Sequence, residues 1–145
     1  MNENKELLVL IHDNIKMGLT STKKMLKLLK DTKSKLKPII EEELKTYESL
    51  LKEVKSLIKK NKLTIEKKGL LKELVSTTAI SKEITKDNSD SNIDSILIRG
   101  FNMGLIDITA KMKTYKKEVD KNILKLSKEL LKFNESEIKR LKEYL

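Results

Sequence analysis

Residues 38–61 read PIIEEELKTYESLLKEVKSLIKKN, and this segment decides the class of fold. Its apolar residues follow one another at spacings of four and three: Ile40, Leu44, Tyr47, Leu51, Val54 and Ile58. At 3.6 residues per turn these positions share one face of a helix. Leu50 and Leu57 widen the stripe, which predicts burial against a bundle rather than against a single partner helix. Pro38 suits the first helical turn, where its missing N–H costs nothing.

The remainder of the chain is also patterned for helices. Apolar residues recur at spacings of three and four over about 4–30, 91–117 and 121–145, which predicts three more long amphipathic helices. The segment Asp87-Asn88-Ser89-Asp90-Ser91 is rich in N-capping residues and predicts the helix start near 91. Four glycines, one proline and 3% aromatic residues are typical of an all-α protein. We expect one domain, 1–145, built as an antiparallel four-helix bundle.

Residues 62–90 interrupt the helical period between the two halves of the chain. They contain a short apolar run after Gly69, which predicts a crossover with one short extra helix. A connection of this length can traverse the bundle and leave the helices at 38–61 and 91–117 parallel, which is the ferritin-like order. The alternative is a simple up-down-up-down bundle with 62–90 folded back as a lid. The segment is long enough for either geometry, and we favour the crossover.

The chain is basic, with 32 Lys and Arg against 22 Asp and Glu and a net charge of +10. Only Arg99 and Arg140 are arginines. Proteins that read bases or clamp phosphates favour Arg, whose planar guanidinium binds bidentately, so this composition argues against specific nucleic-acid binding. A basic patch around the crossover could still engage an acidic partner such as nucleic acid, anionic lipid or an acidic protein. The patch consists of Lys59, Lys60, Lys62, Lys67 and Lys68.

Two nearby segments carry a resemblance to a known group of proteins. Asp87-Asn88-Ser89-Asp90-Ser91, followed by Ile98-Arg99-Gly100-Phe101-Asn102-Met103-Gly104-Leu105-Ile106-Asp107, resembles a segment of uncharacterised clostridial proteins of this length. With its paired amphipathic halves, the chain is similar to the small ferritin-like four-helix bundle proteins of unknown function from Gram-positive bacteria, some of them spore-coat-associated. The resemblance implies a ferritin-like fold over nearly the whole chain.

The chain departs from that fold at the positions where its di-iron members bind metal. Those proteins carry inward Glu residues on two helices and Glu-x-x-His on the other two. This sequence has one histidine, His12, and no Glu-x-x-His. The central inward positions of the helix at 38–61 are predicted to be Leu44, Tyr47 and Leu51. We therefore expect no metal site and no cofactor.

His12 has one candidate polar partner. If the helices at 4–30 and 91–117 are antiparallel, His12 lies at about the level of Asp107. One hypothesis is a buried polar pair at the core margin, joined by a charge-assisted hydrogen bond or acting as a weak ligand site. The other, which we favour, is that His12 is a boundary residue that points to solvent.

Small and apolar residues gather in the helix at 91–117. Gly100 and Gly104 are four residues apart, and Gly18 lies in the middle of the helix at 4–30. Because glycine inside a helix costs about 1 kcal/mol relative to alanine, we expect these glycines to mark close packing of the two helices. The alternatives are a ligand-sized cavity and a chain that approaches from another subunit. Residues 96–108 are also apolar around more of the circumference than a bundle requires. Either the apolar crossover or a second copy of the protein covers them; we expect the crossover to do most of the covering, and a homodimer stays open.

The sequence carries no catalytic signature. It lacks cysteine, a phosphate-binding glycine loop and a glycine-flanked serine, so thiolate, nucleotide-dependent and Ser-His-Asp chemistry have no support. Its longest nearly apolar stretch, 96–108, is too short to span a membrane. We expect a cytoplasmic, non-enzymatic bundle that associates with itself as a scaffold, coat or interaction protein. The alternatives are a binding module for an acidic partner and an atypical metal or small-molecule binder.

Overall fold

The computed structural model describes residues 3–65, 69–115 and 117–145, with side chains of the third helix described from residue 77 onward. These residues form five α-helices and no strand: α1 (Glu3–Leu28), α2 (Lys37–Lys60), α3 (Gly69–Lys86), α4 (Asp90–Tyr115) and α5 (Lys121–Leu141). A 3-10 turn, Lys142–Tyr144, follows α5. The prediction of an all-α protein is confirmed. No helix within the described ranges is long and apolar enough to cross a membrane.

Local sequence signals account for the helix starts. Pro38 lies in the first turn of α2, where no backbone N–H is needed. The hydroxyl of Ser89 accepts a hydrogen bond of 3.3 Å from the backbone N–H of Asn92, so Ser89 caps the start of α4. The helix ends agree less well with the sequence pattern. α1 ends at Leu28 rather than near residue 30, and α5 ends at Leu141 rather than at 145.

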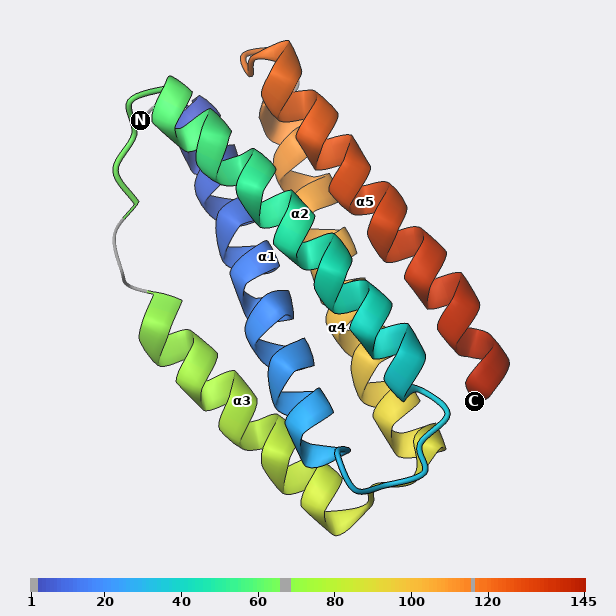
Figure 1. The fold of residues 1–145 in the computed structure, drawn as a ribbon. Coiled ribbons are helices and arrows are strands. Elements are labelled where there is room, and N and C mark those ends of the chain that lie inside the picture. The colour runs from blue at the N-terminus through green and yellow to red at the C-terminus, as the bar shows by residue number, and fades with distance from the viewer. Residues whose placement is uncertain (1–2, 66–68, 116) are drawn as a thin grey trace.

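The connections make α2 and α4 run in the same direction. α1 and α2 are joined by a short turn and run antiparallel, as do α4 and α5 (Figure 1). α3 returns along α1, so α4 starts at the same end of the bundle as α2 (Figure 1). A simple up-down-up-down order would make α2 and α4 antiparallel, and the structure does not have it. α3 spans 18 residues, so the extra helix is longer than the short one predicted.

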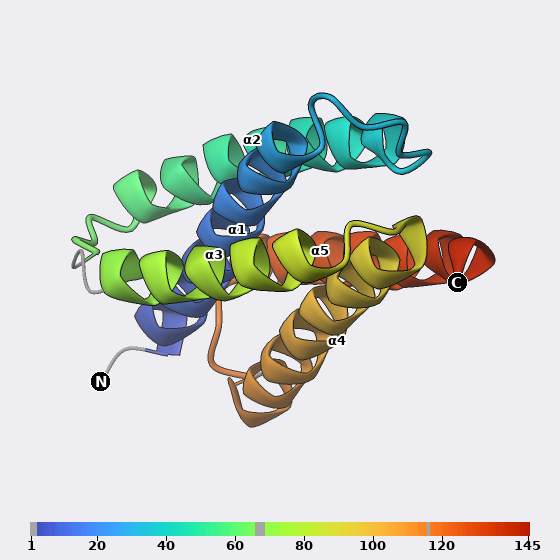
Figure 2. The same ribbon diagram turned by 90° about the horizontal axis from the view of Figure 1, so that it is seen from below.

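The core lies between α1, α2, α4 and α5, with α3 packed mainly along α1. Three aromatic rings fill the middle, and we call Tyr47, Phe101 and Phe133 the aromatic layer. Tyr47 of α2 stacks on Phe101 of α4 with ring centroids 6.3 Å apart, and Phe133 of α5 meets them edge-on at 5.2 and 5.5 Å. Figure 2 shows α2 and α4 on opposite sides of the bundle, with no described helix beyond the outer side of α4.

The buried face of α2 differs from the predicted one. Its buried residues are Ile39, Ile40, Glu43, Tyr47, Leu50 and Val54. Leu44 and Leu51, which the pattern placed at the centre of the core, are only partly buried. The apolar stripe of α2 is wide enough to face the core in more than one rotation, and packing against the other helices selects the rotation that buries Glu43. Leu44 and Leu51 therefore pack against the margin of the core rather than at its predicted centre.

Candidate functional site

Three acidic side chains from three helices are buried at one end of the bundle, and we call them the carboxyl cluster. Glu43 of α2 and Asp94 of α4 are fully buried, and Glu137 of α5 is 8% exposed. Glu43 and Asp94 lie near the starts of their helices, whereas Glu137 lies near the end of α5. These three helix ends meet because α2 and α4 are parallel to each other and α5 is antiparallel to both (Figure 1).

Burial changes the protonation of Glu43. Neither of its carboxyl oxygens accepts a hydrogen bond from a donor in the described part of the chain. Burial raises the pKa of Glu43 from its ordinary value of 4.5 to about 10, and a hydrogen bond shared with the Glu137 carboxyl adds to the rise. Two buried acids that share one proton avoid placing two negative charges side by side. Glu43 is therefore neutral at pH 7 and donates its proton toward Glu137.

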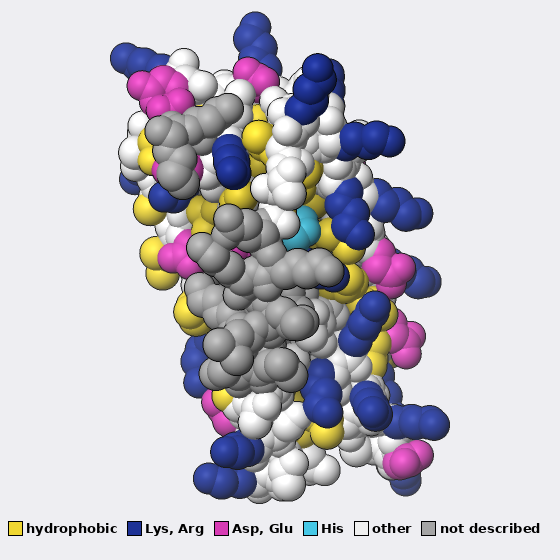
Figure 3. Space-filling model, turned by 90° about the vertical axis from the view of Figure 1, so that its left-hand side faces the viewer, with side chains coloured by type: hydrophobic (Ala, Val, Ile, Leu, Met, Phe, Trp, Pro, Cys, Tyr) yellow, Lys and Arg dark blue, Asp and Glu magenta, His cyan; other side chains and the backbone are white. Residues whose placement is uncertain are grey.

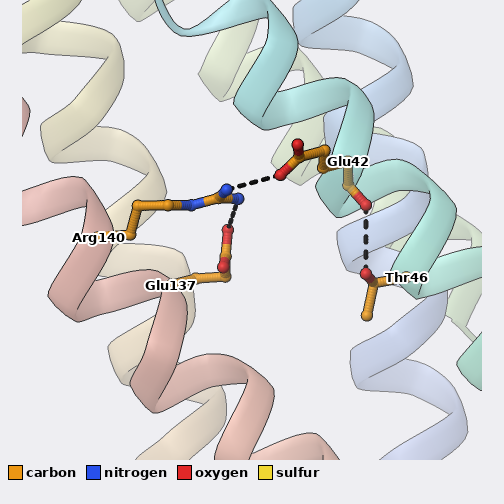
Figure 4. Close-up of polar contacts among 4 residues, drawn as sticks. All are labelled: Glu42, Thr46, Glu137 and Arg140. Carbon is orange, nitrogen blue, oxygen red and sulfur yellow. Dashed lines mark hydrogen bonds and ion pairs between the residues drawn. The ribbon is translucent and has the colours of Figure 1, made fainter.

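Arg140 connects the carboxyl cluster to the surface. Its guanidinium donates from Nη2 to Oε1 of Glu137 and from Nη1 to Oε2 of Glu42, both at 2.6 Å (Figure 4). Glu42 belongs to α2 and is exposed, so Arg140 joins α5 to α2 across the rim of the cluster. The hydroxyl of Thr46, in the same view, donates to the backbone carbonyl of Glu42 at 3.2 Å and stays within α2. The planar fork of Arg suits this two-sided contact.

Asp94 is the second acid whose charge is disfavoured. Both of its carboxyl oxygens are buried and lack a hydrogen-bond partner among the described residues. Burial, with the negative charge of Asp90 one turn earlier, raises the pKa of Asp94 to about 6. Asp90 itself accepts hydrogen bonds from the hydroxyl of Ser34 and, at 3.1 Å, from the backbone N–H of Lys35. These bonds tie the turn between α1 and α2 to the start of α4.

The carboxyl cluster does not have the arrangement of a metal site. Within the described ranges, no three His, Cys, Asp or Glu side chains are grouped so that they could hold a metal ion. The middle of the bundle, where ferritin-like proteins place such ligands, is occupied by the aromatic layer. The chemistry that the cluster supports is the sharing of a proton between buried carboxyls.

His12 and Asp107 are not brought together. The Nδ1 atom of His12 lies 3.3 Å from Oδ1 of Asp13, its neighbour in α1, and the His12 side chain is 16% exposed. Figure 3 shows part of this single histidine at the surface. Asp107 is exposed because α4 turns Gly104 and Ile108 toward the core and leaves position 107 outside. The structure therefore does not form the buried pair of the first hypothesis, and His12 lies at the boundary of the core.

The three glycines have different surroundings. A Cβ atom on Gly18 would overlap the ring of Tyr47, so this glycine lets the Tyr47 side chain pack closely against α1. The helix that Gly18 brings close to α1 is therefore α2, whereas close packing with α4 was expected. A Cβ on Gly104 would lie 2.5 Å from Nδ2 of Asn14 and 2.9 Å from Nδ2 of Asn134. Gly104 thus makes room for two amide side chains. Gly100 has no atom within 4 Å of a Cβ position and lies in open space, so packing within the chain does not explain it.

The predicted basic patch is described only in part. Lys59, Lys60 and Lys62 are exposed around the end of α2, and Lys62 adopts a positive φ of 53° there. Lys67 and Lys68 lie outside the described residues. Figure 3 shows Lys and Arg side chains spread over the visible face of the molecule rather than gathered at one place. This distribution is typical of a solvated surface.

The outer face of α4 is apolar and exposed, and we define it as Gly100, Met103, Ile106 and Ala110. Met103 is 66% exposed and Ile106 is 67% exposed, and the two small residues are exposed as well. The prediction that the crossover covers most of this region is wrong for these residues, because α3 packs along α1 instead. Large apolar side chains left together in water are typical of an interaction surface.

Sequence reasoning missed the carboxyl cluster. The acidic run Glu41-Glu42-Glu43 lies near the start of the helix at 38–61, where carboxylates favour the positive end of the helix dipole, and this pattern does not predict burial of Glu43. One signal was present, since position 43 lies four residues after Ile39 and four before Tyr47, on a line of buried positions. The chain matches no family model, no curated protein and no solved structure. Its function is therefore argued from the geometry.

Proposed function

We propose that the protein is a non-catalytic helical bundle that associates with itself through the outer face of α4 and serves as a scaffold, coat or interaction protein. The observation that carries the proposal is the joint exposure of Met103 and Ile106, at 66% and 67%. Covering apolar surface is favourable by about 25 cal/mol per Å². A second copy of the chain supplies the same apolar surface in return.

The proposal includes a ferritin-like bundle without the di-iron ligands. The common direction of α2 and α4 supports a ferritin-like connection between them (Figure 1). The aromatic layer supports a packing role for the middle of the bundle rather than a metal-binding one. The same proposal includes a relation to ferritin-like proteins of Gram-positive bacteria. It also includes a cytoplasmic location, which the absence of cysteine supports.

Size-exclusion chromatography with light scattering tests self-association. We expect the wild-type protein to elute as a dimer or a larger assembly and the double variant Met103→Glu, Ile106→Glu to elute as a monomer. Leu145→Glu is the matched control, because Leu145 is also 66% exposed but lies at the C-terminus and is not part of the outer face of α4. A wild-type protein that stays monomeric over the accessible concentration range would contradict the proposal.

The ultraviolet spectrum recorded in the same experiment distinguishes self-association from the alternative function, in which a basic surface binds an acidic partner. With no Trp and three Tyr, the protein absorbs weakly in the ultraviolet, so co-purified nucleic acid would dominate its spectrum. Binding through lysines would also weaken steeply with salt. Association through the outer face of α4 depends on apolar contact and should persist at high salt.

A further inference from the structure

We propose that two copies of the chain pair through antiparallel α4 helices, with Met103 of each copy next to a two-fold axis. This inference rests on the proposed self-association and specifies its geometry. A second copy of the same chain covers the outer face of α4.

The residues that carry the inference form one stripe of α4. Arg99 and Asp107 flank Met103 on either side along the helix, and both are exposed like the outer face itself. At 3.6 residues per turn, positions 99, 100, 103, 106, 107 and 110 fall within about one third of the helix circumference. A stripe of this width is what one helix presents to a neighbouring helix.

The stripe is complementary to itself when it is reversed about Met103. In an antiparallel pair, the layer that holds Arg99 and Gly100 in one copy meets the layer that holds Ile106 and Asp107 in the other. Each such layer brings opposite charges together and places a glycine, with open space above it, opposite a large Ile side chain. Because of the two-fold axis, the same contacts between these two layers form a second time on the other side of Met103.

The parallel arrangement lacks this complementarity. A two-fold axis along the helices would place Arg99 beside Arg99 of the second copy and Asp107 beside Asp107 of the second copy. It would also place the two glycines opposite each other, which leaves a gap, and bring two large Ile side chains against each other. Like charges at an interface disfavour that orientation, so the charge pattern selects the antiparallel one.

The existing partner of Arg99 does not prevent this pairing. Arg99 donates from Nη2 to Oε2 of Glu83 at 2.7 Å, and the two side chains are 59% and 45% exposed. An ion pair this exposed contributes little to stability and exchanges readily. The guanidinium also has further N–H donors with which to reach Asp107 of the second copy.

Single-cysteine variants test the geometry directly, because the natural chain contains no cysteine. Under mild oxidation we expect Met103→Cys to form a disulfide-linked dimer and Ala110→Cys to stay unlinked. In the antiparallel pair the two copies of position 110 lie about 20 Å apart, at 1.5 Å per residue over fourteen residues. Lys128→Cys on α5 is the exposed control and should also stay unlinked. Cross-linking of Ala110→Cys at the rate of Met103→Cys would indicate parallel pairing and overturn the inference.

Charge reversal gives a second test on the uncross-linked protein. Arg99→Asp and Asp107→Arg should each weaken dimerisation by about five- to tenfold at low salt, and the double variant should restore it. Circular dichroism checks that each variant is helical. If the wild-type protein is dimeric but the double variant is no tighter than either single variant, the antiparallel register is wrong while the proposed self-association stands. If the wild-type protein is monomeric and Met103→Cys does not cross-link, both are wrong.

Discussion

The aromatic layer and the carboxyl cluster use the same three helices in opposite ways. In the aromatic layer, α2, α4 and α5 each contribute a ring, and the rings fill the space with no charge to accommodate. In the carboxyl cluster, the same helices contribute Glu43, Asp94 and Glu137. Glu43 keeps its proton, burial raises the pKa of Asp94, and Glu137 is paired with Arg140. The first region should therefore respond to changes in side-chain volume, and the second to pH.

The largest effect should come from overfilling the aromatic layer. Gly18→Leu places a side chain where the ring of Tyr47 already lies, and we expect a loss of about 3 kcal/mol in the free energy of unfolding. Gly100→Leu is the matched control, because nothing within the same chain lies within 4 Å of its Cβ position. Both variants are compared at a protein concentration low enough for the chain to be monomeric, since Gly100 lies on the outer face of α4. Urea denaturation at pH 7 measures both. Helix propensity alone favours Leu over Gly, so an equal gain in stability at the two glycines would mean that the contact with Tyr47 does not oppose the substitution.

The second largest effect should be a pH-dependent change in stability when Glu43 is substituted. In the unfolded chain this acid ionises above about pH 4.5, whereas in the folded chain it keeps its proton up to about pH 10. Between these values the folded state binds more protons than the unfolded state, so the free energy of unfolding falls as the pH rises. Gln cannot ionise and can still donate to Glu137. We expect Glu43→Gln to raise Tm by about 5 °C at pH 8 and to change it little at pH 4.5.

Thermal melts at both pH values check this expectation, with Glu41→Gln as control. Glu41 neighbours Glu43 in sequence but is exposed, so its substitution should leave Tm unchanged at either pH. A stabilisation by Glu43→Gln that is the same at pH 4.5 and pH 8 would show that Glu43 has no raised pKa in the folded protein.

Substitution of Asp94 should change Tm less than substitution of Glu43, and over a narrower range of pH. Its pKa rises from 3.8 to about 6, so its contribution lowers stability only as the pH rises between those values. Asp94→Asn should raise Tm by about 2 °C at pH 7 and leave it unchanged at pH 3.5. Asp31→Asn, at an exposed position, is the control for the loss of one negative charge. A drop in Tm at pH 7 would mean that a charged Asp94 stabilises the fold.

The smallest change in the free energy of unfolding should come from a substitution at the rim of the carboxyl cluster. Glu42 pairs with Arg140 at 2.6 Å, but its side chain is 66% exposed. Glu42→Gln should therefore cost less than about 0.5 kcal/mol in urea denaturation. A loss above about 1 kcal/mol would show that the bridge from α5 to α2 acts together with the buried acids.

Sequence reasoning succeeded where the signal is local. Pro38 and Ser89 predicted where α2 and α4 begin, because a missing N–H and a capping hydroxyl act within one helical turn. It failed where an outcome depends on a distant segment. The position of Glu43 near a helix start did not predict its burial, and Gly18 was expected to pack against the helix at 91–117, whereas it packs against Tyr47 of α2.

The sequence by itself determined the helices and their apolar stripes, because hydrophobic periodicity and capping are properties of consecutive residues. Only the tertiary structure decided how each stripe is rotated and what covers it. The rotation of α2 buries Glu43, and the path of α3 along α1 leaves Met103 and Ile106 exposed. Both depend on packing between segments far apart in the chain, and a wide stripe or a long connection permits more than one such arrangement.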